Sequence, residues 1–203
     1  MRSSVELAAS VSGEGPPLIL LHGLFGAGDT LGGVRRRLSP EFQVHSLDLR
    51  NHGESPHTDS MSYPEMAADV LAYMDRAGLE DANLLGHSMG GKVAMEMALM
   101  APERVAQLIV ADIAPVAYTP HHDNIENALR ALDPTQVRSR READSVLAES
   151  IGQRGVRQFL LTNLVPADGG FRWRMNVPGI LACYDQIMAG PHTQGVYEGP
   201  TLF

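Results

Sequence analysis

The chain has 203 residues, of which 44% are hydrophobic and 20% are charged, a composition that suits a globular domain with a sizeable core. A formal net charge of −8 argues against nucleic acid or an anionic membrane surface as a partner. No apolar run has the length of a membrane span or of a signal-peptide core, and Cys183 is the single cysteine. We therefore expect a soluble, cytoplasmic protein.

Short apolar runs alternate with helix-forming segments over the first 113 residues. The runs predict strands over 5–11, 18–21, 42–49, 83–85 and 105–113. Helices are expected to end at Leu38, to run from Ser62 to Ala77 and to cover 89–100. Ser62 with Glu65 three positions later is typical of a capping box, and Gly78 is expected to end that helix. This alternation predicts an α/β fold with a mainly parallel sheet and helices on both faces.

Charged helical stretches follow Pro115 and predict a helical cap inserted over the sheet. Helices are expected over 123–132, 139–151 and 155–164, with a short hairpin around 171–174. Residues 199–203 are typical of the beginning of another apolar strand. We thus expect a single domain made of a core over 1–118, a cap insertion over 119–198 and the start of the next core strand over 199–203.

The hexapeptide Gly-His-Ser-Met-Gly-Gly places Ser88 between a predicted strand and a predicted helix, with Gly86 and Gly90 on either side. Gly-x-Ser-x-Gly in this position is typical of a nucleophile elbow. The strained turn points the hydroxyl toward the N–H groups of a helix N-terminus, which favour developing negative charge. The alternative is a serine that only caps the helix. The context favours Ser88 as a catalytic nucleophile.

A nucleophile elbow requires N–H donors that stabilise the developing oxyanion. The first is the N–H of the residue after the nucleophile, Met89. The second is expected from the loop that begins with His22 and Gly23 after a buried strand, where the Leu24 N–H is best placed. Glycine at position 23 lets the backbone pass close to the reacting carbon. We interpret His22 and His87 as structural residues, with His87 packed away from the nucleophile.

These motifs together resemble the α/β-hydrolase superfamily. The segments "HGLFGAGDTLG", "DLRNHGESP", "MAADV", "GHSMGGKVAMEMAL" and "VADIAPVAY" look in particular like one esterase group, the bacterial YbfF-type esterases and abhydrolase domain-containing protein 11. A looser likeness continues through "VRQFLLTNLV" and "FRWRMNVPGI". The resemblance implies the α/β-hydrolase fold, Ser88 as nucleophile, and Leu24 and Met89 as oxyanion donors. Asp48 and Arg50, in the second segment, are expected to hold loops together.

The resemblance also implies the other two members of a catalytic triad. The acid lies in "DIAP", here Asp112, at the end of an apolar strand where active-site groups of parallel sheets gather. An unpaired carboxylate at that position is energetically costly, which favours a partner such as an imidazolium. The alternative is that Asp112 only caps the following turn. The base is a histidine after the last strand. Because His121, His122 and His192 lie in the cap in unlike contexts, we expect that the catalytic histidine and the final strands are not in this sequence.

The expected activity is that of a serine hydrolase that cleaves carboxylic esters or acyl thioesters through an acyl-enzyme, with no metal or organic cofactor. Apolar cap residues predict an apolar acyl pocket for a small-molecule substrate. Arg138, Arg140 and Arg141 of the cap could meet an anionic leaving group, but a solvated helix face is the simpler interpretation. The scaffold also supports C–C bond hydrolysis and perhydrolysis, and a chain without its base would be a non-catalytic binding protein.

Overall fold

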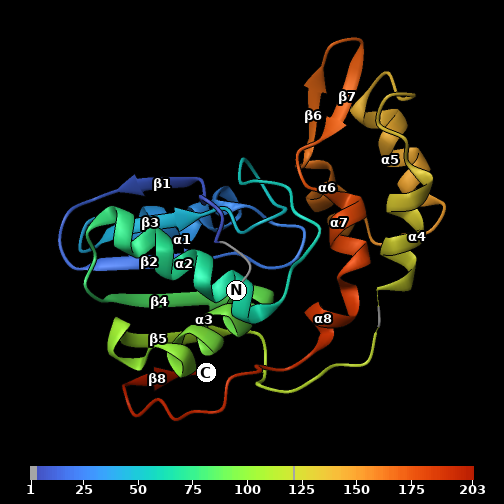
Figure 1. The fold of residues 1–203 in the computed structure, drawn as a ribbon. Helices are drawn as coiled ribbons and strands as arrows, with labels where there is room; N and C mark the ends of the chain where they lie inside the picture. Colours follow the sequence, from blue (N-terminus) through green and yellow to red (C-terminus); the bar gives the residue numbers. More distant parts are fainter. Residues whose placement is uncertain (1–3, 121) are drawn as a thin grey trace.

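The central element of the fold is a sheet with helices on both faces (Figure 1). The computed structural model describes residues 4–120 and 122–203. In this part of the chain, six strands lie in the order β1-β3-β2-β4-β5-β8. Their bounds are Ala9–Ser12 (β1), Gln43–Leu47 (β3), Pro17–Leu21 (β2), Ala82–His87 (β4), Val105–Ala111 (β5) and Thr201–Leu202 (β8). The α/β class and the core strands expected from the apolar runs are confirmed.

The strand directions agree with the prediction of a mainly parallel sheet. β1 is antiparallel to β3, and each of the other four pairings is parallel. The strand expected over 199–203 is confirmed, since Leu108 and Ile109 of β5 pair with Thr201 and Leu202. The strand expected over 5–11 is wrong in its bounds, because β1 begins only at Ala9.

Three helices cover the sheet, and the alternation of side chains along β2 decides which face each one packs on. Leu18 and Leu20 point to the face covered by α1 (Gly32–Leu38). Ile19 and Leu21 point to the main core beneath α2 (Tyr63–Ala77) and α3 (Met89–Met100). Among the helices of the described residues, none is both long and apolar enough to cross a membrane.

The bounds of α2 follow from local signals, as predicted. Ser62 is the N-cap residue, and its backbone N–H donates to the Glu65 carboxylate at 3.0 Å. Gly78 ends the helix in the left-handed conformation, with φ 69°. This capped helix carries two buried residues: Tyr63 donates to the Ile187 carbonyl, and Asp69 accepts from the Val5 N–H.

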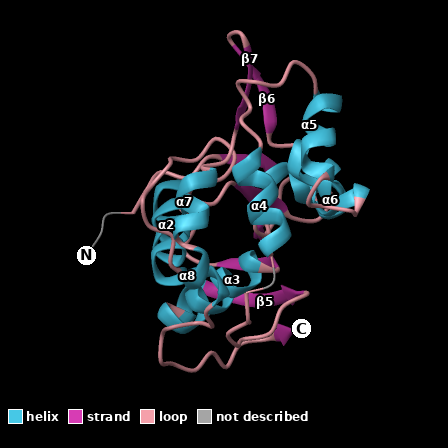
Figure 2. Cartoon of the chain, turned by 90° about the vertical axis from the view of Figure 1, so that its right-hand side faces the viewer, coloured by secondary structure: helices cyan, strands magenta, loops and turns pink. Residues whose placement is uncertain are grey.

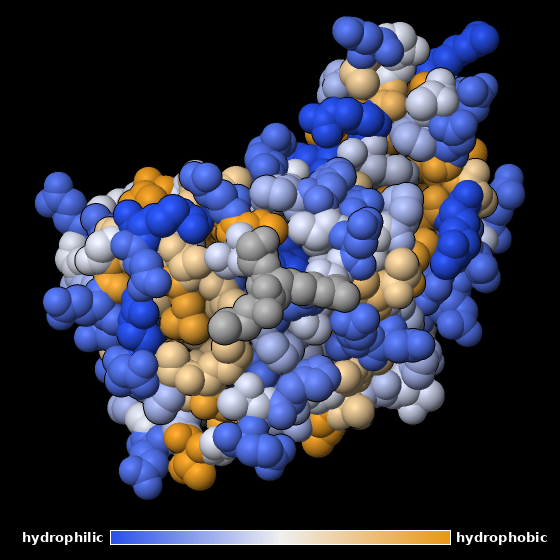
Figure 3. All heavy atoms as spheres, viewed as in Figure 1, coloured by the Kyte–Doolittle hydropathy of each residue, from blue (hydrophilic) through white to orange (hydrophobic). Residues whose placement is uncertain are grey.

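The helices and the hairpin between residues 123 and 188, which we call the cap, lie beyond the carboxyl ends of the strands (Figures 1 and 2), within the insertion expected over 119–198. The cap contains α4 (Asp123–Ala131), α5 (Arg140–Ala148), α6 (Arg154–Leu161), α7 (Val177–Ala182) and α8 (Tyr184–Met188). The first three agree with the predicted helices, each with a shorter C-terminal end. The hairpin of β6 (Leu164–Ala167) and β7 (Gly170–Trp173) is also as expected, and it projects from the body as an arm with a largely hydrophilic surface (Figure 3). The short helices α7 and α8 were not expected.

Candidate active site

Ser88 lies at a sharp turn between β4 and α3. Its backbone has φ 51° and ψ −120°, a strained combination for a residue with a side chain. The Ser88 N–H donates to the Ala111 carbonyl at 2.9 Å, which ties the turn to the end of the neighbouring strand β5. The Ser88 side chain makes no capping hydrogen bond to α3, all of whose residues are described. The Ser88 side chain therefore does not stabilise the N-terminus of α3 by a capping hydrogen bond.

Two glycines make this turn possible. A methyl group at Gly86 would overlap the carbonyl oxygen of Gly90, and a methyl group at Gly90 would overlap that of Leu21. Helix α3 can therefore pass directly over strands β2 and β4 only because both positions lack a side chain. This close approach brings the N-terminus of α3 next to Ser88, as the motif predicted.

Backbone strain is concentrated around Ser88. In the described part of the chain, the non-glycine residues with positive φ are Phe25, Asn51, Ser88 and Asp112. Ser88 and Asp112 line the same cavity, and Phe25 follows Leu24, which also lines it. Strained backbone persists where the surrounding structure over-determines it, and it often marks functional sites. This clustering is independent of the sequence motif.

The cavity next to Ser88 has a volume of about 500 Å³ and is bounded by both the core and the cap. Its lining residues are Leu24, Tyr63, Ser88, Met89, Lys92, Asp112, Ile113, Ala114, Tyr118, His122, Ile187 and Met188. Half of these are aliphatic, so a ligand meets a partly apolar wall with a few polar groups, as is common for small-molecule sites. The structure therefore brings Leu24, Ser88, Met89 and Asp112 to one cavity.

The loop of residues 23–26, which we call the oxyanion loop after the role expected for Leu24, has its Gly23 carbonyl held by two donors. His22 donates from Nδ1 to this carbonyl at 2.8 Å, and the Gly26 N–H donates to it at 2.9 Å. Because C=O and N–H point in opposite directions in a trans peptide, these bonds direct the Leu24 N–H to the other side. Among the described residues, no acceptor takes the N–H of Leu24 or of Met89. Both groups can therefore donate to a ligand in the cavity.

His22 has the structural role expected from the sequence. Its Nε2 accepts a hydrogen bond from the Leu49 N–H at 3.0 Å while Nδ1 donates to Gly23, so the ring is neutral. Burial lowers the pKa of His22 to about 4, against a weaker opposing effect of the Gly23 hydrogen bond. With both nitrogens engaged and no exposure to solvent, His22 cannot exchange protons with a substrate.

Asp112 lies immediately after β5, and its carboxylate is 90% exposed. The backbone at Asp112 is left-handed, with φ 58°, and the side chain faces solvent at the end of the apolar strand. His87 is only partly packed, with its side chain 43% exposed, and its Nε2 lies 4.0 Å from the Asp112 carboxylate. The His87 ring lies beside Gly23, in agreement with a packing role, and its remaining part is exposed. Asp112 is open to an imidazole approaching over Ser88.

The other histidines considered as a base have different surroundings. His121 lies outside the described residues. His122 lines the Ser88 cavity, but its Nδ1 is 2.6 Å from the Tyr184 hydroxyl. His192 is exposed, and its ring lies against Tyr63 with a centroid separation of 6.5 Å. Among the described residues, neither His122 nor His192 is hydrogen-bonded to Ser88 through its side chain.

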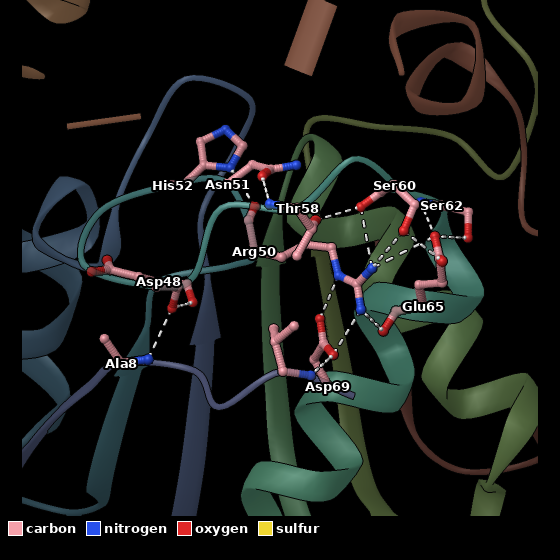
Figure 4. Close-up of polar contacts among 12 residues, drawn as sticks. Ala8, Asp48, Arg50, Asn51, His52, Thr58, Ser60, Ser62, Glu65 and Asp69 are labelled. Atoms are coloured by element: carbon pink, nitrogen blue, oxygen red, sulfur yellow. Dashed lines mark hydrogen bonds and ion pairs between the residues drawn. The ribbon is translucent and has the colours of Figure 1, made fainter. Parts of the chain in front are cut away.

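Asp48 and Arg50, in the turn after β3, hold neighbouring loops together, as expected (Figure 4). Asp48 accepts hydrogen bonds from the N–H groups of Gly28 at 2.6 Å and Glu54 at 2.9 Å. Arg50 is buried, and its guanidinium binds both oxygens of Asp69 at 2.6 and 2.9 Å. These contacts fix residues 48–60 against α2.

Sequence reasoning missed Lys92, the single lysine, which lies one helical turn after Ser88 and is 2% exposed. Its Nζ donates to the carbonyls of Met188 and Ala189 and lies 4.8 Å from the centroid of the Tyr118 ring. Burial lowers the pKa of Lys92. The i+4 spacing from Ser88 was the available signal, because it places both side chains on one face of α3.

Buried Glu96 continues the same face of α3. Its carboxylate accepts hydrogen bonds from the N–H groups of His192 at 2.6 Å and Thr193 at 3.0 Å. Lys92 and Glu96 of α3 thus hold the end of α8, whose Ile187 and Met188 line the cavity, and the chain that follows it. The position of this part of the cavity wall is therefore coupled to the helix that carries Ser88.

A parallel sheet with a strained Ser88 at a strand–helix turn, opposite a cavity with available N–H donors, defines the α/β-hydrolase class of proteins. Residues 16–151 match the family model described as alpha/beta hydrolase fold. The chain belongs to this family.

Individual relatives agree with this assignment. The chain is 40% identical over 196 residues to sn-1-specific diacylglycerol lipase ABHD11 of Mus musculus, covering 93% of this chain and 64% of the relative. It is 37% identical over 188 residues to esterase YbfF of Escherichia coli, covering 92% of this chain and 72% of that protein. A solved structure titled marine microorganism esterase superposes with a TM-score of 0.95 at 41% identity, covering 98% of this chain and 80% of that one. The chain thus spans somewhat less than two thirds of the length of the mouse relative, and its resemblance to the YbfF and ABHD11 group is confirmed.

Proposed function

We propose that this protein is a serine hydrolase that cleaves carboxylic esters, or acyl thioesters, through an acyl-enzyme. The observation that carries the proposal is the strained Ser88, which shares one cavity with Asp112 and with the residues that present the Leu24 and Met89 N–H groups. The names of the relatives, an esterase and a diacylglycerol lipase, support an ester as the substrate. The partly apolar lining of the cavity supports an acyl group that is itself apolar.

The proposed reaction follows from this arrangement. The Ser88 hydroxyl attacks the acyl carbon as an imidazole takes its proton, and the carbonyl oxygen becomes an oxyanion that accepts from Leu24 and Met89. The imidazolium, oriented by Asp112, returns the proton to the leaving alcohol or thiol. Water then attacks the acyl-enzyme by the same route and releases the acid. That the imidazole comes from outside residues 1–203 stays a prediction.

The proposal is tested by Ser88→Ala in the natural full-length protein. Hydrolysis of p-nitrophenyl acetate, butyrate and octanoate should fall by on the order of 10⁴–10⁶, with the melting temperature nearly unchanged. Labelling by a fluorophosphonate probe should be lost at the same time. Ser145→Ala, at an exposed serine of α5, is the matched control and should leave both signals intact. Hydrolysis that persists in Ser88→Ala would mean that another residue is the nucleophile.

A further inference from the structure

Three consecutive peptide units of the oxyanion loop are each held by a different buried side chain. The first, between residues 23 and 24, is held through its carbonyl by His22. The second is held through the Phe25 N–H, which donates to Nε2 of His52 at 3.1 Å. The third is held through the Phe25 carbonyl, which accepts from Nδ2 of Asn163 at 2.7 Å. His52 and Asn163 are both fully buried.

Phe25 needs both contacts because its backbone is left-handed, with φ 62°. A bulky residue in this region is strained and remains there only when several contacts with its surroundings hold it. His52 binds the N–H and Asn163 binds the C=O of the same residue, so Phe25 is clamped from both sides. Without either contact, the loop gains freedom to relax toward an ordinary conformation.

We propose that His52 and Asn163 are positioning residues of the oxyanion hole, which act by clamping Phe25 so that the adjacent Leu24 N–H stays directed at the carbonyl oxygen of the substrate. This inference rests on the proposed function, because it takes the Leu24 N–H as an oxyanion donor. Neither residue lines the cavity, so neither touches the reacting atoms.

The two clamping residues come from different parts of the molecule. His52 lies in the turn after β3, where its Nδ1 donates to the Arg50 carbonyl at 3.0 Å and leaves Nε2 as an acceptor. Asn163 lies in the cap between α6 and β6, and its own carbonyl accepts from the Arg174 N–H at 2.8 Å. The geometry of the oxyanion hole therefore depends on the cap being seated on the core.

The test uses two variants that remove one hydrogen-bonding partner of Phe25 and keep the volume. His52→Phe keeps a ring without an acceptor, and Asn163→Leu keeps a branched side chain without a donor. Each should lower kcat for p-nitrophenyl butyrate by about 10–100-fold, because displacing a catalytic group by about 1 Å costs up to about 100-fold in rate. KM should change by less than about threefold. His52→Gln, which restores an acceptor oxygen, should recover part of the loss.

Two further measurements separate positioning from general damage. The inhibition constant of a trifluoromethyl ketone, whose adduct with Ser88 carries an oxyanion, should rise by the factor by which kcat/KM falls. Amide hydrogen exchange at Phe25 should become faster in both variants. Matched controls are His45→Phe, another buried histidine, and Arg157→Met, which removes hydrogen bonds within the cap to the carbonyls of Ile151 and Gly152. Both controls should leave kcat and the inhibition constant unchanged.

The inference is overturned if His52→Phe and Asn163→Leu fold with kcat and the inhibition constant unchanged, or if the two controls reduce kcat equally. The failure of the proposed function looks different, since ester hydrolysis would then survive Ser88→Ala. If the unmodified protein has no hydrolase activity, the exchange measurement still decides whether the clamp exists. Unchanged exchange at Phe25 in both variants would refute the clamp.

Discussion

The buried ion pair between Arg50 and Asp69 should contribute strongly to stability, and Asp69→Asn tests this. The Asp69 side chain is 0% exposed and that of Arg50 is 3% exposed. One Asp69 oxygen also accepts from the Val5 N–H at 2.8 Å. Asparagine can keep that contact and one contact with Arg50, but it leaves the guanidinium charge buried without its closest counter-charge. Removing one partner of a buried pair costs about 3–5 kcal/mol.

For a domain of this size, about 1 kcal/mol lowers Tm by roughly 2–4 °C, so Asp69→Asn should lower Tm by roughly 6–12 °C or more. The matched control is Asp75→Asn. Arg104 and Asp75 form a contact of 2.8 Å, against 2.6 Å for Arg50 and Asp69, but the Asp75 side chain is 67% exposed. Exposed pairs contribute about 0.2–1 kcal/mol, so this variant should lose less than about 4 °C. Urea unfolding followed by circular dichroism gives both free energies, and equal losses in the two variants would refute the reasoning.

Three further predictions concern the candidate site. Asp112→Asn should lower kcat on the order of 10⁴-fold if the Asp112 carboxylate orients the catalytic imidazole. Asp185→Asn on α8 is the control and should leave kcat unchanged. A loss of kcat below about tenfold in Asp112→Asn would mean that another residue is the triad acid. His122→Asn should hydrolyse esters at a rate within about tenfold of the parent. The reason is that Nδ1 of His122 contacts the Tyr184 hydroxyl and that, among the described residues, His122 has no hydrogen bond to Ser88. Complete loss of hydrolysis would identify His122 as the base. Burial lowers the pKa of His22 to about 4 and that of His52 to about 3, from an ordinary value of 6.5. Below pH 6.5 the unfolded chain therefore binds protons at these two histidines that the folded protein does not bind. The free energy of unfolding should therefore fall as the pH drops from about 6.5 to 4, more steeply in the parent than in His52→Phe, and equal slopes in the two proteins would contradict this origin.

The elements that could be predicted from the sequence are those fixed by local signals. The capping box at Ser62 and the left-handed Gly78 determine the ends of α2, and the continuous apolar run of β2 marks a strand buried on both faces. The bounds of β1 depend instead on its partner β3, with which it pairs over only four residues. Helices α7 and α8 have six and five residues, too few to show a helical period, and packing of Ile180 and Ile187 into the core stabilises them.

The residues of the candidate site also differ in how far the local sequence predicts their structure. Ser88, Met89 and the loop before Leu24 belong to short motifs whose residues are adjacent in sequence, so the structure could be anticipated there. The exposure of Asp112 could not, because it follows from a left-handed backbone at a residue other than glycine. Lys92 contacts the carbonyls of Met188 and Ala189, which lie 96 and 97 positions further along the sequence. No local sequence pattern predicts such distant partners.

The oxyanion loop shows why such long-range contacts matter for the chemistry. A glycine at position 25 would adopt a positive φ without support, but it would also leave the loop free to leave that conformation. Phenylalanine is instead held there by His52, 27 positions away, and by Asn163, 138 positions away. The strain at Phe25 is thus offset by contacts that form only in the folded protein with the cap seated on the core. A hydrogen-bond donor fixed in this way needs no reorganisation when the oxyanion forms, and electrostatic stabilisation of a transition state depends on that property.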